Sequence, residues 1–411
     1  MSVKKYDIAI IGGGASGLAA AISAKRVNRK LSVAVIEGLP RVGKKLLATG
    51  NGRCNLSNSD LRDIHYHGTN KDLAMITSGF SVPDFFAGLG VLCEDDGYGR
   101  IYPRCRSAAS VLDALRLECI KLGVTEICDT EITDIRCGDG FTLVSADKKI
   151  SARAVILAGG GRSQPALGSN GSLFDICERL GITIMKPYPA LVPLRTEASL
   201  VKSLKGQRAD AKVNFSVNDK FLMSSRGEVQ FTDGLLSGIC VFDLSYLCSQ
   251  WHGDKCELFL DLLPDMESGQ VTELLRSVRT IRNNAPAEDF LSGIFTRPMG
   301  IYLLKRAFGK LPDRTGDISD LEALVRTIKY LSFPVTGTAG FERSQVTYGG
   351  IAAPLIKQTK SSFELWGIPG MYACGEIIDI SGDCGGYNLD FAFSSGAIAG
   401  RNAAEDLAKR N

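Results

Sequence analysis

Several features are missing from the sequence, and each absence narrows what the protein can be. No stretch reaches the ~18 consecutive apolar residues that a membrane-spanning helix needs, so we expect no membrane segment. None of the twelve cysteines forms a Cys-x-x-Cys pair, which argues against a zinc site and against the disulfide framework of a small secreted protein. Internal repeats and low-complexity runs are also absent. Scattered cysteines are typical of reduced thiols, and we expect a cytoplasmic protein.

The N-terminus resembles a secretion signal, but we reject that interpretation. Lys4 and Lys5 precede an apolar run that ends in AAAISA, which has the form of a cleavage site. Cleavage there would destroy the glycine-rich turn Gly12–Gly17. That turn is better explained as part of a nucleotide site.

Charge and size set only loose limits. The chain has 411 residues, 48 basic and 45 acidic side chains, and a net charge of +3. At roughly 150 residues per domain, this length predicts two or three domains. The charge balance neither requires nor excludes a polyanionic partner. Glycine is abundant, with 45 residues, which indicates tight turns or backbone that lies close to something.

The N-terminal segment has the order strand, glycine turn, helix, strand and acid. Residues 7–11 form a short apolar run suited to a buried parallel strand, and residues 12–17 fit G-x-G-x-x-G. An alanine-rich helix is expected over 18–27 and a second strand over 31–36, with Glu37 at its end.

This pattern predicts a bound dinucleotide. Gly12 permits the tight turn, Gly14 lets the backbone approach a pyrophosphate, and Gly17 lets the helix pack on the strand. The helix N-terminus attracts the pyrophosphate, and Glu37 can accept hydrogen bonds from ribose hydroxyls. The acid favours FAD or NAD over NADP.

The end of the chain favours FAD over NAD. A strand is expected over 371–374, ending at Gly375-Glu376, followed by a glycine-rich turn over 382–386 and a helix over 387–407. Flavoproteins of the two-dinucleotide-fold type end in this way. The acid binds a ribityl hydroxyl, and the helix N-terminus points at the flavin pyrimidine edge, where negative charge gathers on reduction. A C-terminal docking helix with a glycine-rich entry is the simpler alternative.

A third apolar run, residues 154–158, also ends in glycines, including Gly159 and Gly160. No second acid-terminated strand follows, so a second nucleotide fingerprint is a weak interpretation. We expect an antiparallel ribbon from residues 141–145 and 149–152. A strand over 130–135, which contains Ile132, is expected beside the adenine.

The α/β rhythm stops between about Tyr188 and Val335. Short antiparallel strands are expected at 212–217, 220–223, 228–231 and 256–260, with a turn at Asn218-Asp219. Helices are expected at 268–279, 297–308 and 319–331. The predicted fold class is therefore α/β: a Rossmann-like FAD-binding domain, with a parallel sheet and an antiparallel ribbon, carries an inserted antiparallel β unit and a helical cap.

The predicted domains follow from this pattern. The FAD-binding domain comprises 1–188 and 336–411, the inserted β substrate domain 189–265, and the helical cap 266–335. We expect the insertion to cover the flavin and to select the substrate.

The segment GNGRCNLSN, residues 50–58, has almost no side chain that could anchor a core. Its glycines would let the main chain lie flat beside an aromatic ring, and its asparagines tolerate left-handed backbone. Arg53 could supply positive charge to a phosphate or to reduced flavin. The segment therefore fits a cofactor better than it fits a mobile surface loop.

Other candidates are less specific. His65 and His67 have no cluster of acids or cysteines beside them in the sequence, so we interpret them as surface residues, and we expect no metal. Cys54 and Cys384 lie in predicted cofactor motifs, where either could donate a proton, act as a redox thiol or simply pack. A basic run is interpreted as a solvated loop, with an RNA-contacting edge left open; it comprises Lys202, Lys205, Arg208 and Lys212.

Six segments, taken in order, resemble the BaiN-like, aminoacetone-oxidase-like family of FAD-dependent flavoproteins over nearly the whole chain. They are the Gly12–Gly17 fingerprint, GKKLLATGNGRCNLSN, LAGGGRSQPALGSNGS, QFTDGLLSG, QVTYGGI and CGEIIDISGDCGGYNLDFAFSSG. The resemblance implies that Lys44 and Lys45 flank the FAD phosphates and that residues 50–55 curl under the flavin. One segment departs from the family. Its middle motif, Gly-Leu-Ser-Gly-Pro after a basic residue or His, is replaced here by a run from Thr232 to Ile239, which leaves the substrate open.

Motifs and resemblance together define one predicted FAD site. Its members are Gly12, Gly14, Ala15, Ser16, Gly17, Glu37, Lys44, Lys45, Gly50, Gly52, Arg53, Cys54, Asn55, Ile132, Gly159, Gly160, Gly375, Glu376, Asp379, Gly386, Tyr387, Asn388 and Leu389. The sequence indicates no general acid or base and no oligomeric state.

We expect an FAD-dependent oxidoreductase in which hydride passes to or from flavin N5. Three functions compete. The favoured one is reduction of a C=C bond, in a steroid-like small molecule or in a ribosomal RNA uridine, with NAD(P)H as donor. The second is oxidation of a small amine such as aminoacetone by oxygen, and the third is RNA or protein binding with little turnover. No second dinucleotide fold is visible, so NAD(P)H would bind transiently in the substrate cavity.

Overall fold

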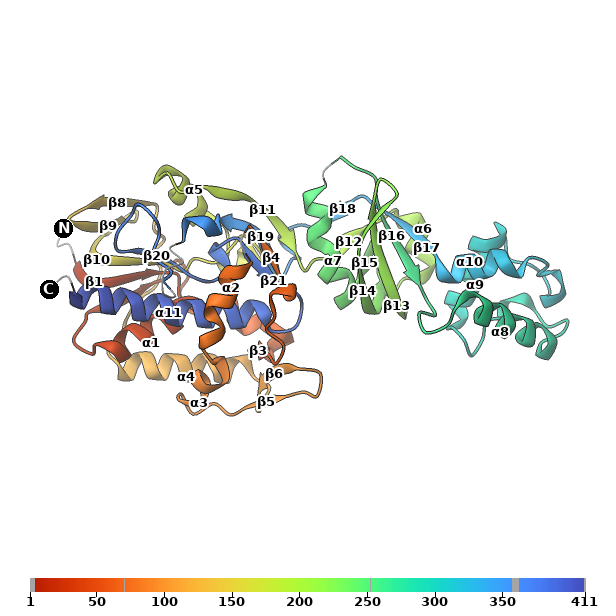
Figure 1. The fold of residues 1–411 in the computed structure, drawn as a ribbon, viewed down its shortest axis with the longest axis horizontal. Coiled ribbons are helices and arrows are strands. Elements are labelled where there is room, and N and C mark those ends of the chain that lie inside the picture. Colours follow the sequence, from red (N-terminus) through yellow and green to blue (C-terminus); the bar gives the residue numbers. More distant parts are fainter. Residues whose placement is uncertain (1–3, 70, 252, 357–361, 410–411) are drawn as a thin grey trace. The chain divides into compact units, whose positions relative to one another are not determined.

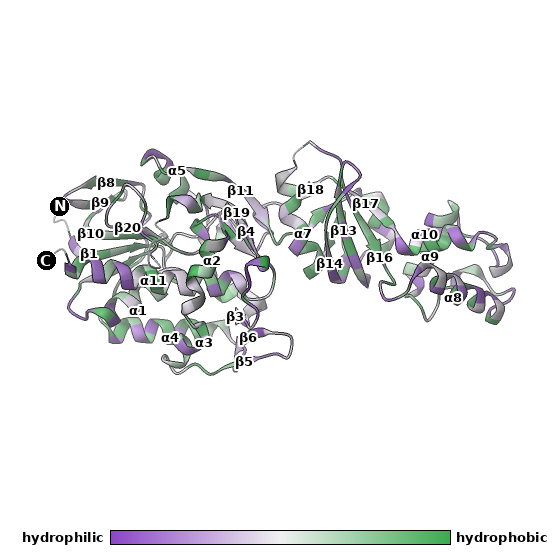
Figure 2. Ribbon diagram, in the orientation of Figure 1, coloured by the Kyte–Doolittle hydropathy of each residue, from purple (hydrophilic) through white to green (hydrophobic). Residues whose placement is uncertain are grey.

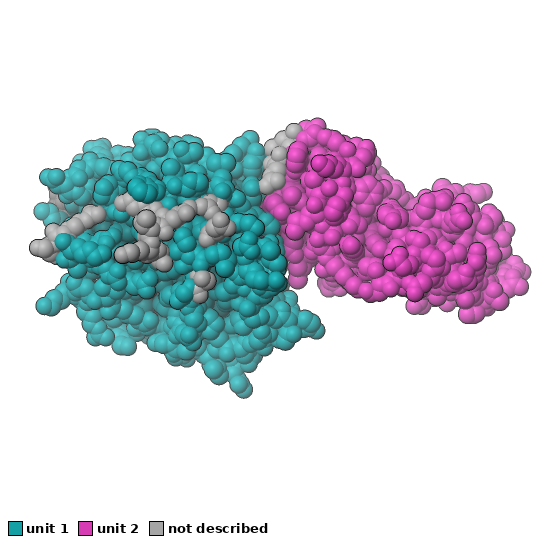
Figure 3. Space-filling view, viewed as in Figure 1, with its two compact units in different colours: residues 1–189, 345–411 teal, residues 190–344 magenta. Residues whose placement is uncertain are grey.

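The computed structural model describes residues 4–69, 71–251, 253–356 and 362–409. The chain forms two compact units, the first from residues 1–189 and 345–411 and the second from residues 190–344. Figure 3 colours the two units teal and magenta. A mixed sheet in one unit and a separate antiparallel sheet in the other confirm the predicted α/β fold class.

The core of the first unit is a mixed seven-stranded sheet in the order β7-β2-β1-β10-β9-β8, with β20 paired to β10 (Figure 1). β7, β2, β1, β10 and β20 run parallel, and β9 and β8 form an antiparallel ribbon. The strands are β1 Lys4–Ile11, β2 Val33–Ile36, β7 Thr125–Ile127, β8 Asp134–Gly138, β9 Gly140–Val144, β10 Lys149–Leu157 and β20 Met371–Ala373. The parallel strands are buried on both faces of the sheet, which explains why their sequences are continuous apolar runs.

Two strand predictions in this sheet are wrong. Residues 130–133 form no strand, because the strand beside β2 is β7 and β8 begins only at Asp134. Residues 149–152 and 154–157, which the sequence predicts as separate strands, form the single strand β10.

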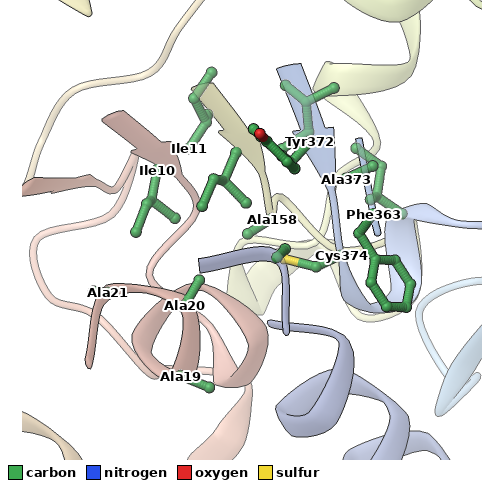
Figure 4. Packing of buried hydrophobic residues seen from close by; sticks show 14 of the residues in the cluster. Ile10, Ile11, Ala19, Ala20, Ala21, Ala158, Phe363, Tyr372, Ala373 and Cys374 are labelled. Atoms are coloured by element: carbon green, nitrogen blue, oxygen red, sulfur yellow. The ribbon is translucent and has the colours of Figure 1, made fainter. Parts of the chain in front are cut away.

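Helices α1 (Ala15–Val27) and α11 (Tyr387–Lys409) pack against each other in the first unit (Figure 1). Small residues make the contact. A Cβ atom on Gly396 would lie 2.2 Å from Ser16 O, and one on Gly400 would lie 2.1 Å from Ala20 O. The two helices therefore touch at their backbones, which holds the end of the chain against its beginning. Figure 4 shows the alanine face of α1 beside Ile10 and Cys374.

Short elements complete the first unit. They comprise helices α2 Asp72–Ile76, α3 Val82–Ala87, α4 Ala108–Lys121 and α5 Ser172–Arg179; the sheet of β3 Ser57–Asn58, β6 Arg100–Pro103 and β5 Cys93–Asp95; and the strand pairs β4 Tyr66–Gly68 with β21 Ile380–Gly382, and β11 Ile184–Ala190 with β19 Val346–Ile351. Two 3-10 helices, η1 Leu46–Gly52 and η9 Gly375–Ile377, contain predicted site residues.

The second unit is built on an antiparallel sheet in the order β17-β16-β13-β14-β15-β12-β18. Its strands are β12 Leu194–Arg195, β13 Arg208–Val217, β14 Lys220–Phe231, β15 Leu235–Ser237, β16 Cys256–Asp261, β17 Leu331–Val335 and β18 Gly337–Thr338. The β13–β14 hairpin turns at Asn218-Asp219, as predicted, and both residues have positive φ (48° and 63°). β14 is one strand where the sequence predicts two.

The helices of the second unit are α6 Ala198–Val201, α7 Ile239–Gln250, α8 Ser268–Ile281, α9 Arg297–Phe308 and α10 Leu321–Lys329. In α10 the buried residues include Leu321, Leu324, Val325 and Ile328, one stripe at helical spacing, and Figure 2 shows polar and apolar stretches mixed in α8 and α10. α7 packs on β14 and is not predicted from the sequence. β17 pairs with β16, so residues predicted to close the helical cap belong to the sheet. The division of this unit at residue 265 stays a prediction.

None of the helices in the described part of the chain has the length and apolar character that crossing a membrane requires.

Candidate functional site

Four parallel strands of the first unit end at one edge of the sheet. Ile11 is paired with Ile36 and with Leu157, and Leu157 is paired with Ala373. The segments that follow these strands contain Gly12, Glu37, Gly159 and Gly375. Ligands of open α/β sheets bind at the carboxyl ends of the strands, so this edge is where a site is expected.

Three of the four glycines between Gly12 and Gly17 have no room for a Cβ atom, and Gly14 is the exception. Gly12 has φ +107°, and a Cβ on Gly17 would lie 2.0 Å from Gly12 O. In contrast, a Cβ on Gly14 would have no atom within 4 Å. Gly14 caps α1 without a side-chain hydrogen bond, so Ala15 and Ser16 begin a helix whose first N–H groups can bind an anion. The open space at Gly14 leaves this end of the helix accessible to a ligand.

Glu37 is fixed by the backbone of this turn. Gly13 N donates to Glu37 Oε2 and Leu39 N to Oε1, both at 2.9 Å. A carboxylate has about four acceptor positions, so capacity remains for two ribose hydroxyls. Thr130 N donates to Glu37 O at 2.9 Å. Ile132, which the sequence places in a strand, therefore belongs to an irregular segment that passes Glu37, and its side chain is buried.

Lys45 and Glu376 form an ion pair at this edge. Lys45 Nζ lies 2.6 Å from Glu376 Oε2, and Thr347 N donates to Glu376 Oε1 at 2.9 Å. Gly375 has φ +73°, and a Cβ on it would lie 2.6 Å from Ser16 Oγ. The Gly375-Glu376 motif therefore lies at the start of α1. Lys44 does not join this ion pair; its Nζ donates a hydrogen bond to Ala166 O at 3.1 Å.

The triglycine after β10 belongs to the same edge. A Cβ on Gly12 would lie 2.3 Å from Ala158 O, and a Cβ on Gly161 would lie 2.9 Å from Glu376 Oε1. Gly160 has φ +72°. Gly159 and Gly160 therefore form a turn that lies between the Gly12 turn and Glu376.

The segment from Gly50 to Asn55 has the left-handed backbone that its composition suggested. Gly50, Asn51, Gly52 and Cys54 all have φ between 54° and 81°. Arg53 is exposed and lies over the ring of Tyr102. Cys54 is fully buried, and burial raises the pKa of its thiol to about 12. Because the thiolate is the nucleophilic form, this environment favours packing over a redox or proton-donor role for Cys54.

The glycine-rich turn before α11 lies against this segment. A Cβ on Gly386 would lie 2.2 Å from Ser57 O and 2.9 Å from Asn55 Oδ1, and Asn58 Nδ2 donates to Gly385 O at 2.9 Å. Asn55 Oδ1 is buried and has no hydrogen-bond partner among the described residues. Buried acceptors are normally paired, so a bound molecule with a donor at this point would complete the site.

The other predicted residues of this turn have defined contacts. Asn388 accepts from Gly382 N at 2.8 Å and donates to Gly382 O at 2.7 Å, so its side chain closes the turn. The ring of Tyr387 stacks on His65, with centroids 4.6 Å apart. Leu389 is partly buried and packs on the main core. Asp379 lies in a different setting, where Thr69 N donates to Oδ2 at 2.9 Å and burial raises the pKa of the carboxyl.

The two histidines, predicted as surface residues, are half-buried. Their side chains are 23% and 13% exposed, and His65 Nδ1 and His67 Nε2 lie 3.0 and 2.8 Å from the carboxylate of Asp383. Asp383 is distant in sequence, so the pair looked isolated. The described residues contain no group of three or more potential ligand side chains arranged to hold a metal.

Two buried polar residues were missed. Ser57 Oγ donates to Asp390 Oδ2 at 2.5 Å, and each side chain belongs to a residue that is 2% exposed. Ser57 lies two residues after the predicted cofactor segment 50–55, and Asp390 lies directly after 386–389. Both are also part of the segments that carry the family resemblance, which is the sequence signal for them.

Known proteins resemble this chain over nearly its whole length. The model of the HI0933-like protein Rossmann domain matches residues 6–402. A 3-dehydro-bile acid delta(4,6)-reductase of Clostridium scindens is 34% identical over 407 residues, which are 97% of this chain and 99% of that protein. A ribosomal RNA dihydrouridine synthase of Escherichia coli is 27% identical over 405 residues, 96% of each protein.

Solved structures share the fold. The 3-ketosteroid delta1-dehydrogenase from Sterolibacterium denitrificans, in complex with 1,4-androstadiene-3,17-dione, has a TM-score of 0.53 at 13% identity. The match covers 98% of this chain and 100% of that chain. At this identity the likeness shows the fold alone.

Proposed function

Because this chain belongs to the HI0933-like Rossmann family of FAD-dependent oxidoreductases, we propose that it reduces a C=C bond conjugated to a carbonyl in a small, steroid-like molecule, with NAD(P)H as donor. The observation that carries the cofactor part is the meeting of segments from both ends of the chain at one sheet edge. FAD would supply hydride transfer through its N5 atom.

The residues at this edge have separate tasks in the proposal. The open position at Gly14 and the start of α1 receive the pyrophosphate, and Glu37 binds the ribose of the adenosine half. Glu376 and Lys45 lie between them and the turn before α11, where Asn55 and Gly386 are positioned for the flavin. In this way the protein orients the cofactor and excludes water from part of its length.

The small-molecule substrate is preferred over RNA because the relative that is 34% identical over 97% of this chain bears the name of a bile-acid reductase, whereas the ribosomal RNA dihydrouridine synthase is 27% identical. The charges of the second unit do not decide between the two. Lys205 Nζ lies 3.0 Å from Asp233 and Arg208 Nη1 lies 3.0 Å from Glu228, but all four side chains are more than half exposed, so phosphates could compete for these cations.

Anaerobic flavin kinetics test the proposal. The purified protein with bound FAD is first mixed with NADH or NADPH, and bleaching of the flavin is followed. The reduced protein is then mixed with a steroid whose ketone is conjugated to a ring double bond. We expect rapid recovery of the oxidised spectrum and a product that carries two more hydrogen atoms. The saturated ketone of the same skeleton is the matched control and should leave the flavin reduced.

Other outcomes identify other functions. Reoxidation by unmodified ribosomal RNA, with no reaction of the conjugated ketone, would assign the protein to uridine reduction. Bleaching by aminoacetone followed by release of peroxide in air would make it an amine oxidase. Salt-sensitive retention of RNA with no turnover would make it a binding protein. Each of these results contradicts the proposed substrate and leaves the FAD site intact.

A further inference from the structure

A buried carboxyl group lies directly behind the turn predicted to meet the flavin. Asp390 is in the first turn of α11, immediately after the predicted cofactor residue Leu389, and it is 2% exposed. Its Oδ2 accepts a hydrogen bond from Ser57 Oγ at 2.5 Å. Ser57 is itself 2% exposed and follows the Gly50–Asn55 segment. Protein atoms therefore shield this hydrogen bond from solvent.

The Asp390 carboxyl joins the two segments that form this part of the site. Asp390 N donates to Gly386 O at 2.9 Å, and a Cβ on Gly386 would lie 2.2 Å from Ser57 O. The carboxyl, Ser57 and Gly386 therefore form one packed group. A charge that appears on a ligand beside Gly386 would act on Asp390 across a region of low dielectric.

The surroundings of Asp390 offer little to compensate a negative charge. Tyr66 of β4 is buried, and burial together with the nearby Asp390 raises the pKa of its phenol. On α11 itself the nearest ionisable side chain is that of Tyr387, one turn earlier. Among the described residues no basic side chain contributes to the pKa of Asp390, which burial raises to about 7.

Basic groups on the neighbouring elements have other partners. His65 and His67, before and within β4, contact Asp383. Arg100 of β6 lies 2.7 Å from Asp96. The proton on Asp390 is therefore controlled by burial, by Ser57 and by whatever charge a ligand brings.

We propose that Asp390 takes up one proton from solvent when the bound flavin receives a hydride. Asp390 does not touch the reacting atoms in this proposal; it links proton uptake by the protein to reduction of the flavin. The donor C–H bond of the nicotinamide breaks and an N–H bond forms on the flavin, which gains two electrons, one proton and one unit of negative charge. The Asp390 carboxylate becomes a carboxylic acid. When hydride leaves for the substrate, the flavin loses the charge and Asp390 returns its proton to solvent.

The physical reason is a like-charge interaction. An added negative charge disfavours a nearby carboxylate and raises its pKa further. The protein atoms alone raise the pKa of Asp390 to about 7, through burial. Between its pKa beside oxidised flavin and its higher pKa beside reduced flavin, each reduction therefore consumes one extra proton. Below the first value Asp390 is already protonated, and no extra proton is taken up. This inference rests on FAD binding, and it is independent of the substrate.

The pH dependence of the flavin midpoint potential tests the inference. The potential is measured with an electrode and mediator dyes, between about pH 6 and 9, for the FAD-loaded wild type and for Asp390→Asn, which can still accept from Ser57 but cannot titrate. For a two-electron couple one extra proton steepens the slope by about 30 mV per pH unit. We expect this extra slope above about pH 7 in the wild type only. Equal slopes in the two proteins overturn the inference.

Two further measurements exclude trivial explanations. Asp406→Asn changes a carboxylate of the same helix that contacts Tyr372 and Lys409, and it should keep the wild-type slope. If Asp390→Asn retains no flavin, the inference is tested on the wild type with isotope-labelled aspartate, by the infrared difference spectrum between the reduced and the oxidised protein. A label-sensitive carboxylic acid band must appear on reduction at about pH 8, and its absence refutes the inference. In the potential measurement the electrode supplies and removes the electrons, so neither NAD(P)H nor substrate is needed. A negative result therefore contradicts the role of Asp390 and says nothing about the substrate in the proposed function.

Discussion

The two units of the molecule are specified by their sequences in different ways. In the first unit, single positions are fixed by contact between backbones, as at Gly17, whose Cβ would lie 2.0 Å from Gly12 O. In the second unit Gly238 makes one such contact, with Glu228 O at 2.0 Å, but a Cβ on Gly206, Gly253 or Gly269 would have no atom within 4 Å. Buried stripes such as that of α10 hold the helices of this unit on each other. A cofactor site demands particular residues, whereas a supporting core demands a pattern.

The ion pairs of the two units also differ, in how far their side chains are exposed to solvent. In the first unit Lys45 and Glu376 pair within the predicted cofactor edge, with side chains 23% and 19% exposed. In the second unit Lys205 and Asp233 pair at 64% and 75% exposure. Water and salt screen the exposed pair far more strongly. Substitutions should therefore affect function in the first unit and leave little trace on the surface of the second.

The largest effect on stability and FAD binding is expected from substitution of two glycines of the first unit. Gly17→Ala forces a methyl group against Gly12 O, which should cost about 1–3 kcal/mol or more of stability and abolish FAD retention. Gly14→Ala meets no protein atom, so we expect it to fold within about 1 kcal/mol of the wild type while it weakens FAD binding by at least ~10-fold, or ~1.4 kcal/mol. Urea unfolding and flavin absorbance measure both quantities.

Gly269→Ala in the second unit is the control for these variants, since it has open space and no positive φ. It should be neutral in both assays. Full flavin content and unchanged stability in Gly17→Ala would remove the contrast between the units.

The next effect concerns pH. Burial raises the pKa of Asp390 to about 7 in the folded protein, above the ordinary value of 3.8. The folded state therefore binds more protons than the unfolded state between these values, and stability falls as pH rises. At saturating FAD, the free energy of unfolding of the wild type relative to Asp390→Asn should decrease by an amount on the order of 3 kcal/mol between about pH 5 and 8. A difference that is constant with pH would show that Asp390 does not titrate in this range.

A smaller and more local effect is expected in the core of the second unit. Leu258 of β16 is fully buried, and Leu258→Ala should destabilise the second unit by about 2–5 kcal/mol. Phe221→Ala on β14 is the matched control, because Phe221 is 56% exposed; its cost should stay within about 0.5 kcal/mol. Under native conditions both variants should retain FAD. Loss of flavin from Leu258→Ala without denaturant would mean that the units are not specified independently.

The smallest effect is expected at a surface ion pair. Lys205→Ala and Asp233→Ala, alone and together, should give a coupling energy below about 1 kcal/mol in a double-mutant cycle. The coupling should decrease with added salt. Lys45→Ala, in contrast, should lower FAD affinity measurably. A strong, salt-independent coupling between Lys205 and Asp233 would contradict the contrast between the charges of the two units.

Local patterns predicted the first unit well where the signal was continuous in the chain. The strand, turn and helix around Gly12 and the acid at Glu37 could be recognised because their residues are neighbours in sequence. The strand predicted over 130–135 is wrong for residues 130–133, where the buried Ile132 lies in an irregular segment beside Glu37. Tertiary contacts bury apolar residues of irregular segments too, so the same short apolar pattern occurs outside strands.

Contacts between distant segments could not be predicted. His65 has one carboxylate partner nearby in the sequence, Asp60, but the acid that contacts both His65 and His67 is Asp383, which the pairing of β4 with β21 brings to them. The Ser57–Asp390 hydrogen bond joins residues from opposite ends of the chain. In the second unit, α7 begins at Ile239 after Gly238, whose φ of +114° and close approach to Glu228 O were not visible in an apolar run.

A structure of the protein with FAD bound is the most direct test of the central claim, that one extended cofactor is held by both ends of the chain. We predict that the pyrophosphate lies at the N–H groups after Gly14, and that the isoalloxazine ring lies against Gly386 and the Gly50–Asn55 segment. A flavin bound away from either of these segments would contradict the account.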